Sequence, residues 1–549
     1  MKNKYNYFCS IVSIFFFLFS NLLTAQDIEW QQVLGGVHSE YLYDVKATPD
    51  YGFLLIGSSF SEDSGNKSGK GQGDLDYFLW KMDESGKMEW QKTFGGSGSD
   101  YLYSASLTKE GGYILGGSSD SPKSGDKQED GFGNMDFWIL KLDPTGEEEW
   151  QLSLGGIGND QLQSIQQTPD GGFIIGGSSD SSPIPSKGGG TSGSGEISIK
   201  SQNSFGSFDY WVIKLSAGGE VEWEKTFGGM FSDQLKTVLI TEDGYLIGGT
   251  SNSLISGNKS AKELGMNDYW IIKLDADGNQ EWQRAYGGEG DESLAQILET
   301  ENGYLLAGSS NSSPLGRSGG ASNGTDFWVL EIDKNGESIW DNTYDTGQWD
   351  MLVNILPLAP SKGGGTQPRE YLLGGYASSE TLGKRTDNKG INDFVAIKIN
   401  QRGEMLWSKT IGGNGTDQLK GLTQTRDGGY ILAGNSDSKK SDDKDKASIG
   451  GNDYWVVKLG NEKKSAEERQ LVEIYPNPTY QYTNIIISEE FKEAEVQVFN
   501  LNGQKLQSKR LPYRSTPVDL QGYPPGVYIF KIIGDGKTED VKVIKRGNK

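Results

Sequence analysis

The chain has 549 residues, a formal net charge of -23, one cysteine and one histidine. Its acidic balance disfavours a nucleic-acid ligand, because phosphate binding needs clustered Lys and Arg. A single cysteine excludes intrachain disulfides and zinc sites built on several thiolates, so stability has to come from burial and sheet pairing.

Residues 1–25 predict a secretory signal peptide. Lys2 and Lys4 precede an apolar run from Ile11 to Leu23, and Thr24-Ala25 follows it, which is the order of a cleavable leader. A retained membrane anchor is the alternative, but the run is shorter than the about 20 residues that a span needs. Because Cys9 lies inside the leader, we expect a mature chain without cysteine. No later segment is apolar enough to span a membrane, so we also expect a mature chain without a transmembrane helix.

Residues 26–460 repeat a unit of roughly 60 residues. A tryptophan anchors each copy, at Trp30, Trp90, Trp150, Trp223, Trp282, Trp340 and Trp407. An aspartate that opens an aromatic segment follows each tryptophan, at Asp76, Asp136, Asp209, Asp268, Asp326, Asp393 and Asp453. Because the tryptophan and the aspartate each occur seven times, the sequence predicts seven complete units.

The copy at residues 268–298 has few insertions and serves as a template. Its first segment, 268–274, is apolar on both faces, as in a strand buried between two sheets. The turn 275–278 ends in Gly278, which can take the left-handed conformation of a tight hairpin. A second strand carries Trp282, a third begins near Glu292, and the turn at Asn302-Gly303 leads into a fourth. Each unit therefore predicts four antiparallel strands.

Repeated four-stranded units predict an all-β fold, a seven-bladed β-propeller over residues 26–460, with a linear β-solenoid as the rival. The first tryptophan segment, 28–34, has no preceding partner, and the last aromatic segment, 454–459, has no following one. Pairing the N- and C-terminal strands would close the ring and leave no bare sheet edge.

In this ring, tight glycine turns lie on one rim, and the Gly-Gly loops lie on the other rim with seven long connections. The long connections vary in length and composition while the strands keep their pattern. We expect such a rim to bind a ligand, although unconstrained drift would look the same.

Two sets of acids are candidate cation ligands. The seven strand-opening aspartates could hold cations on one rim, but the favoured interpretation is that each closes a turn through its carboxylate and backbone amides. A second set follows the Gly-Gly loops, at Glu40, Asp100, Asp160, Asp233, Glu292, Asp350 and Asp417, and turn capping is favoured for it too. The long connections are rich in the oxygen donors that suit Ca²⁺, yet none matches the spaced calcium-loop pattern. A Ca²⁺ cofactor is therefore a hypothesis only.

Most tryptophans recur at strand positions, so we interpret them as packing between blades. Trp349 differs, because Tyr344-Asp345-Thr346-Gly347 stands there in place of the usual Gly-Gly. This departure marks either a working surface or decay of the repeat. His38 falls in a loop, and we interpret it as a surface residue and not as a catalytic base.

An enzyme is the minority interpretation. Paired carboxylates can hydrolyse glycosides without His or Cys, but nothing in the sequence selects one pair among the repeated acids. The alternative function is thus a carboxylate-dependent glycan hydrolase or lyase, and a third is a passive surface protein.

From Leu471 the repeat stops, and alternating segments at 484–488, 495–499 and 526–533 predict a small Ig-like β-sandwich. Four ordered motifs lie in it: Tyr475-Pro476-Asn477-Pro478, a turn at Asn502-Gly503, Gly526-Val527-Tyr528, and Lys542 to Lys545. Residues 471–549 with these motifs resemble the type A C-terminal sorting domain of type IX secretion cargo. The repeats before them are similar to the glycine-rich propeller repeats often found on such cargo.

The resemblance implies export from a Bacteroidota-type bacterium, with the type IX secretion machinery as partner and the polar linker 461–470 as the place of cleavage. It implies a product that is secreted or attached to surface lipopolysaccharide. We therefore expect a secreted or cell-surface propeller that binds an extracellular carbohydrate, protein or cation through its variable loops.

Overall fold

The computed structural model describes residues 26–183, 200–312, 324–358, 370–378, 389–460, 471–475, 477–479, 482–487, 494–511, 514–520 and 522–546. The predicted leader 1–25, the predicted linker 461–470 and Pro476 of the sorting motif lie outside these residues. Within the described ranges, no helix has the length and apolar character to cross a bilayer.

Residues 28–459 form four-stranded antiparallel sheets, seven of them in the described part of the chain. Sheet 1 contains β2 (Glu40–Ala47), β3 (Phe53–Ser59), β4 (Asp76–Met82) and β5 (Met88–Phe94). Sheet 2 contains β6 (Asp100–Leu107), β7 (Tyr113–Ser119), β8 (Asp136–Leu142) and β9 (Glu148–Leu154). Sheet 3 contains β10 (Asp160–Gln167), β11 (Phe173–Ser179), β12 (Asp209–Leu215) and β13 (Val221–Phe227). Sheets 4 and 5 contain β14 (Asp233–Thr241), β15 (Gly244–Ser251), β16 (Asp268–Asp275) and β17 (Gln280–Tyr286); and β18 (Glu292–Glu299), β19 (Gly303–Ser310), β20 (Asp326–Asp333) and β21 (Ser338–Tyr344). Sheet 6 contains β22 (Trp349–Pro357), β23 (Glu370–Ser378), β24 (Asn392–Asn400) and β25 (Met405–Ile411), and sheet 7 contains β26 (Asp417–Gln424), β27 (Tyr430–Ser436), β28 (Asp453–Leu459) and β1 (Ile28–Leu34).

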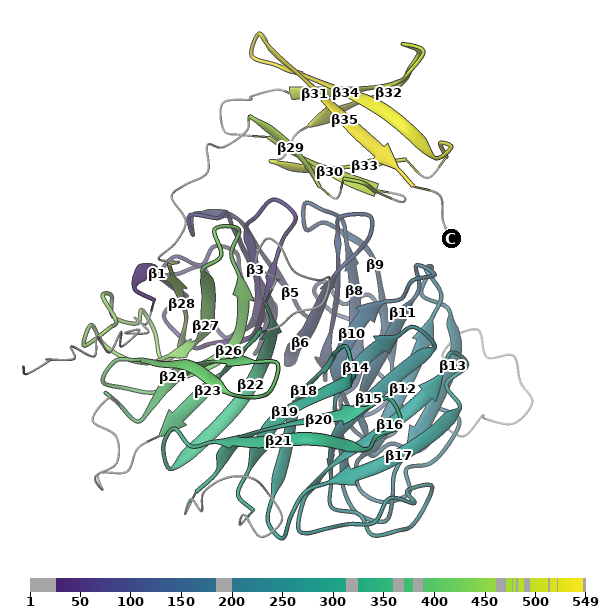
Figure 1. Cartoon of the computed structure of the whole chain (residues 1–549), viewed down its shortest axis with the longest axis vertical. Coiled ribbons are helices and arrows are strands. Elements are labelled where there is room, and N and C mark those ends of the chain that lie inside the picture. The colour runs from purple at the N-terminus through teal and green to yellow at the C-terminus, as the bar shows by residue number, and fades with distance from the viewer. Residues whose placement is uncertain are drawn as a thin grey trace, which may run out of the picture.

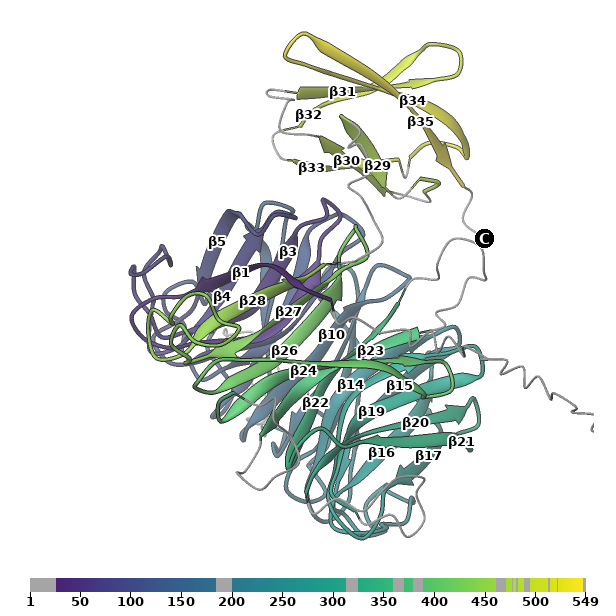
Figure 2. The ribbon, with the colours of Figure 1, turned by 60° about the vertical axis from the view of Figure 1, so that its left-hand side comes forward.

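Sheet 7 is built from both ends of the repeat region. β1 pairs antiparallel with β28, in a register that joins Leu34 to Tyr454 and Ile28 to Leu459. The first strand of each sheet contacts the first strand of the next sheet, and β26 of sheet 7 contacts β2 of sheet 1. The sheets follow one another around the body (Figures 1 and 2). The fold is thus all-β and propeller-like.

The hairpin turns show why glycine recurs. Gly86, between β4 and β5, has a φ of 79°, which only glycine adopts without strain. A Cβ atom at Gly86 would lie 2.9 Å from the ring of Trp30, and five more anchor tryptophans, from Trp90 to Trp340, pack in the same way on the turn glycine of the following sheet. The anchor tryptophans and the turn glycines therefore fit each other.

The core lies between neighbouring sheets. Aromatic rings of their third strands stack in tilted pairs, such as Tyr77 with Trp138 at 4.7 Å between ring centroids and Phe137 with Trp211 at 4.9 Å. The hydroxyl of Tyr77 also donates a 2.9 Å hydrogen bond to the carbonyl of Trp138. These contacts agree with the interpretation of strand tryptophans as packing residues.

The C-terminal region forms two further sheets around one core. One contains β29 (Val472–Tyr475), β30 (Tyr482–Ile487) and β33 (Ser515–Asp519), and the other β31 (Ala494–Asn500), β32 (Lys505–Leu511), β34 (Gly526–Gly534) and β35 (Lys537–Lys545). Ile485, Val496 and Phe530 from both sheets are fully buried in a shared cluster. Figures 1 and 2 place these strands beside one end of the repeat body.

Candidate functional site

The two acid sets meet in pairs, one pair at each junction between neighbouring sheets. The pairs are Asp76 with Asp100, Asp136 with Asp160, Asp209 with Asp233, Asp268 with Glu292, Asp326 with Asp350, Asp393 with Asp417, and Asp453 with Glu40. All of these side chains are buried. The sequence identified both sets but not their pairing.

The first acid of a pair closes the end of the long connection before it. In Asp136, Oδ2 accepts hydrogen bonds from the backbone N–H of Phe132 at 2.6 Å and of Gly133 at 3.3 Å. Asp76 and Asp268 accept equivalent bonds from Gln72 and Leu264. This is the turn-closing role that the sequence favoured.

The second acid closes the Gly-Gly loop and holds the next connection. Asp100 accepts hydrogen bonds from the backbone N–H of Gly96 at 2.7 Å and from the hydroxyl of Ser121 at 3.0 Å. The first glycine of the loop is required by close approach, since a Cβ atom at Gly95 would lie 1.7 Å from Oδ1 of Asp76. The glycine leaves room for the carboxylate of the first acid.

Burial disfavours the ionised form of these acids. Burial, together with the charge of the second acid of each pair, raises the pKa of Asp76 to about 7 and the pKa of Asp136 to about 6. One carboxylate oxygen of Asp136 and one of Asp160 are buried without a hydrogen-bond partner in the described structure. A pair in this state favours a bound proton or a nearby cation.

A buried lysine lies beside most pairs, and the sequence analysis missed it. Lys127 is 1% exposed and its Nζ donates a 2.6 Å hydrogen bond to the carbonyl of Ser121, in a turn closed by the Ser124–Lys127 bridge. The same turn recurs with Lys67, Lys259 and Lys444. The sequence does contain a signal for these turns, because a Ser-Gly-Asn-Lys or similar tetrapeptide recurs in the long connections, which otherwise vary in length and composition.

The loops of both acid sets form what we name the long-loop rim, which comprises the Gly-Gly loops and the long connections. On this rim a pocket of about 270 Å³ opens between β2 and β26. Its lining consists of Tyr41, Tyr43, Thr416, Gln418, Lys420, Asn435, Asp437 and Asn452. The pocket therefore lies at the junction between sheet 1 and sheet 7.

Aromatic rings and lysines line the centre of the body next to the pocket. Tyr43 and Tyr103, from β2 and β6, meet edge to face with 4.8 Å between ring centroids. Lys420 of β26 lies 5.7 Å from the ring centroid of Tyr376. Burial lowers the pKa of Lys420, and the nearby charge of Lys236 lowers it further.

The sixth tryptophan repeat is different in structure as well as in sequence. Trp349, the first residue of β22, is 56% exposed, unlike the buried tryptophans of the third strands. It forms a parallel bridge with Thr325, which precedes Asp326. Exposed His38 also lies on the long-loop rim, as expected of a surface residue.

The sorting-motif residues hold the C-terminal sheets together. The side chain of Asn477 donates to the carbonyl of Lys542 at 2.7 Å and accepts from the N–H of Ile544 at 3.0 Å. Gly503, in the Asn502-Gly503 turn between β31 and β32, has a φ of 77°. Gly526, Val527 and Tyr528 open β34, and Tyr528 donates to the carbonyl of Pro524 at 2.5 Å. Lys545, at the end of β35, is 8% exposed and bonds to the carbonyl of Tyr523, while Tyr475 is 59% exposed.

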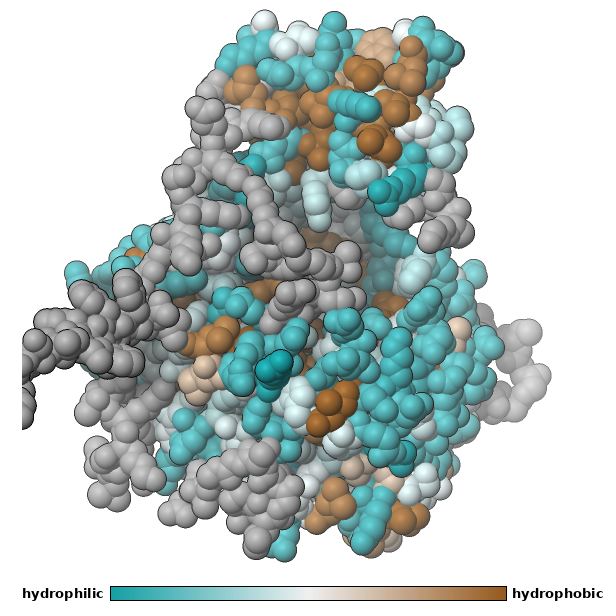
Figure 3. All heavy atoms as spheres, viewed as in Figure 1, coloured by the Kyte–Doolittle hydropathy of each residue, from teal (hydrophilic) through white to brown (hydrophobic). Residues whose placement is uncertain are grey.

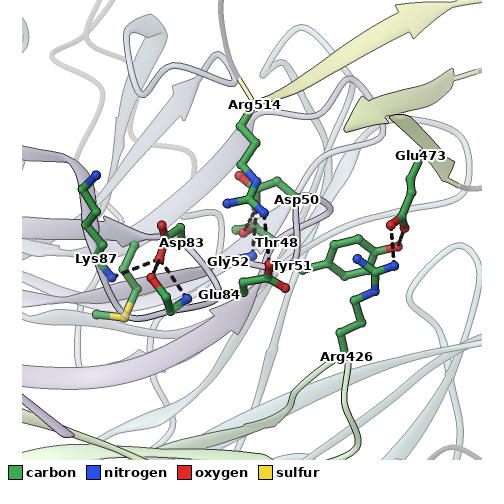
Figure 4. Close-up of polar contacts among 12 residues, drawn as sticks. Thr48, Asp50, Tyr51, Gly52, Asp83, Glu84, Lys87, Arg426, Glu473 and Arg514 are labelled. Atoms are coloured by element: carbon green, nitrogen blue, oxygen red, sulfur yellow. Dashed lines mark hydrogen bonds and ion pairs between the residues drawn. The ribbon is translucent and has the colours of Figure 1, made fainter. Parts of the chain in front are cut away.

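The C-terminal sheets contact the rim opposite the long-loop rim, which we name the hairpin rim and which comprises the turns at 48–52, 83–87, 108–112 and 425–429. The hydroxyl of Tyr51 donates a 2.7 Å hydrogen bond to Glu473, and Arg426 stacks on the ring of Tyr51 at 4.2 Å and pairs with Glu473 (Figure 4). Arg514 pairs with Glu84 at 3.1 Å. Figure 3 shows hydrophobic side chains gathered on the C-terminal sheets above a mostly hydrophilic body.

Tyr51 holds a conformation that is unusual for its residue type. Its φ is 65°, while Gly111, Gly171 and Gly428 fill the same place in other turns with φ values of 89°, 92° and 84°. A non-glycine residue in this region costs roughly 1 kcal/mol. Local strain of this kind is retained where the side chain serves a purpose, here the contact with Glu473.

Comparisons with known proteins separate the two regions. Residues 473–546 match the family of the secretion system C-terminal sorting domain. Similar solved structures include the extracellular domain of a putative hybrid two component system from B. thetaiotaomicron, with 10% identity, a TM-score of 0.37, and coverage of 93% of this chain and 57% of that chain. Another is the Pan2 WD40 domain of Neurospora crassa, with 10% identity, a TM-score of 0.41, and coverage of 80% of this chain and 99% of that chain.

This chain thus spans just over half the length of the first of these structures, and TM-scores below 0.5 carry no information about its function. The comparison with curated proteins gives no match. The chain therefore carries a type IX C-terminal sorting domain at residues 473–546, which marks it for export to the cell surface or the medium, behind an all-β body of repeated four-stranded sheets.

Proposed function

We propose that residues 26–460 form a closed seven-bladed propeller that binds an extracellular carbohydrate through the pocket on its long-loop rim. Residues 1–25 would be removed as a signal peptide, and the linker 461–470 would join the propeller to the sorting domain at 471–549. The observation that carries the proposal is the pocket between β2 and β26, which lies on the rim opposite the one that the described residues of the sorting domain contact.

Closure is supported by the strands at the two ends of the repeats. β1 supplies the outer strand of sheet 7, and the contact of β26 with β2 brings the last sheet against the first. A ring satisfies the edge strands that a linear array would expose. The pocket depends on this junction, because its walls come from the first and the last sheet.

The chemistry of the lining favours a sugar over an apolar ligand. Tyr41 and Tyr43 offer aromatic surface, which packs on the C–H faces of sugar rings. Gln418 and Asn452 offer amide groups, and Lys420 offers a cation for an acidic sugar. Few polar groups placed on an aromatic wall are typical of small-molecule sites.

The hydrolase alternative gains no support from the repeated acids. Glycoside hydrolysis needs two carboxylates that flank the scissile bond, whereas Asp100, Asp160 and Asp417 are each 0% exposed and hydrogen bonded to the loops that they close. Asp437 is the acid among the described lining residues. Its Oδ1 accepts the backbone N–H of Thr416 at 2.6 Å.

The test is a glycan array probed with the wild-type protein and with Lys420→Ala. Lys440→Ala is the matched control, because Lys440 is an exposed lysine of the long-loop rim that lies outside the pocket lining. Binding that Lys420→Ala weakens at least tenfold and Lys440→Ala retains would support the proposal. Release of reducing ends over time would favour the hydrolase or lyase, and absence of binding to any glycan would favour a protein ligand or a passive surface role.

A further inference from the structure

One loop of the long-loop rim differs from its sister loops in its first residue. In the sister loops, the residue that follows the fourth strand of the sheet, which carries the anchor tryptophan, is glycine. Asp345 follows β21 at the place that Gly95, Gly155, Gly228, Gly287, Gly412 and Gly35 hold in the sister loops. At those places a Cβ atom would lie 1.7 to 2.1 Å from a carboxylate oxygen of the neighbouring aspartate. A third carboxylate thus enters where the other junctions leave room only for glycine.

The three acids at this junction come together from separate elements. Asp326 opens β20, Asp350 lies near the start of β22, and Asp345 is in the loop that joins sheet 5 to sheet 6. One carboxylate oxygen from each lies within 4.8 Å of the other two. Asp326 and Asp350 are buried, whereas Asp345 is exposed, so the cluster has a closed inner side and an open outer side.

Asp350 supplies a separate indication of a ligand. Its side chain is 0% exposed, and Oδ2 accepts the backbone N–H of Thr346 at 2.5 Å. Its Oδ1 is buried and has no hydrogen-bond partner in the described structure, as is also true of Oδ1 in Asp100, Asp160, Asp233 and Asp417. Among the described residues, it is the pair of Asp350 that a third acid joins. A buried carboxylate oxygen without a donor is costly, and Asp326 and Asp345 add negative charge beside it.

We propose that Asp326, Asp345 and Asp350 bind one divalent cation, and that Ca²⁺ is its natural occupant. Three carboxylates form a hard, all-oxygen donor set, which suits Ca²⁺ and excludes the softer metals that prefer nitrogen and sulfur. The open side next to Asp345 leaves room for the water ligands with which Ca²⁺ completes its shell.

This site differs from the other acid pairs. A third carboxylate joins its acid pair at the place where the sister loops have glycine. Among the described residues, Asp326, Asp345 and Asp350 are the group of three acids that lie close enough together to share a metal ion. We therefore expect a single cation for each chain and not seven.

The test is isothermal titration of the chelator-treated protein with CaCl₂, followed by thermal unfolding with and without CaCl₂. The wild type should bind one equivalent and unfold at a higher temperature when Ca²⁺ is present. Asp345→Gly restores the sister sequence and should fold normally, but should lose at least tenfold in Ca²⁺ affinity. Asp350→Asn should do the same, and Asp345→Gly covers the case in which that variant fails to fold.

Glu289→Gln is the matched control, since Glu289 is an exposed acid in the equivalent loop between sheets 4 and 5. It should bind one equivalent of Ca²⁺ as tightly as the wild type. The proposal is overturned if the wild type binds no Ca²⁺ at millimolar concentration, if Asp345→Gly binds as tightly as the wild type, or if about seven equivalents bind. These readouts do not involve glycans, so they are independent of the carbohydrate proposal.

Discussion

Replacing Asp136 by asparagine should make the protein more stable at neutral pH. Burial raises the pKa of Asp136 from 3.8 to about 6, with Asp160 as the charged neighbour that adds to the effect. The folded chain therefore holds this proton to a higher pH than the unfolded chain does. Stability falls as the pH rises from about 4 to about 6, and the loss is complete above that range.

The size of the loss follows from the change in pKa. A rise from 3.8 to about 6 corresponds to about 3 kcal/mol at about 1.4 kcal/mol for each pH unit. Asparagine is neutral at every pH, its side-chain oxygen can accept the bonds from Phe132 and Gly133, and its amide can donate toward the carboxylate of Asp160. We therefore expect Asp136→Asn to raise the free energy of unfolding by about 2 to 3 kcal/mol at pH 8.

The assay is urea unfolding of the wild type and the variant at pH 8 and at pH 4.5. At pH 4.5 the folded wild type already carries the proton, so the two proteins should differ by less than about 1 kcal/mol. Glu147→Gln is the control, at an exposed acid of the β8–β9 turn that pairs with Lys92, and it should change the free energy of unfolding by less than about 1 kcal/mol at both pH values. A variant that is less stable by the same amount at both pH values would refute the reasoning, because it would show that the ionised carboxylate is the form that closes the turn.

Three further predictions concern closure, the buried lysines and the contact of the sorting domain. Deleting residues 26–34 removes β1, in which Val33 and Leu34 are 5% and 4% exposed, and should cost at least about 3 kcal/mol in denaturant unfolding; an unchanged midpoint would argue against the closed ring. Lys259→Ala removes an Nζ that donates to the carbonyls of Ser253 and Ala261 and should cost about 2 to 4 kcal/mol, while exposed Lys262→Ala should cost nothing. Tyr51→Gly should relieve about 1 kcal/mol of backbone strain and loosen the sorting domain, seen as faster proteolysis within 461–470; Tyr51→Phe, which loses only the hydroxyl, should give an intermediate rate, and equal rates in all three proteins would contradict the role of this contact.

Local sequence patterns explain why much of the fold can be predicted from the sequence. The segment from Asp268 was expected as a buried strand and forms β16, and Gly278 takes the left-handed conformation with a φ of 76°. The pairing of 28–34 with 454–459 followed from two segments that each lacked a partner, and β1 does pair with β28. Strand period and turn chemistry act over short distances in the sequence. The pairing of the two ends acts over a long distance, but it follows by elimination once every other segment has a partner.

The candidate sites were harder to predict from the sequence, because each of them forms where two sheets meet. The two acids of a pair, such as Asp136 and Asp160, have the same separation in sequence in six of the seven pairs, yet their contact depends on how one sheet packs on the next. Lys127 is charged and lies among Ser, Gly and Asp, a composition typical of a solvated loop, whereas the structure buries its side chain. The pocket has one wall from each end of the repeats, and Asp345 became informative only when its neighbours Asp326 and Asp350 were seen beside it.

The side on which the sorting domain sits gives the molecule a direction. Glu473 and Arg514 contact turns at one end of the body, and the pocket and the three-acid cluster open at the other. Any tether made through the C-terminal end would therefore hold the hairpin turns toward the cell envelope. The loops with the pocket, Trp349 and Asp345 would then face outward, where extracellular polymers arrive.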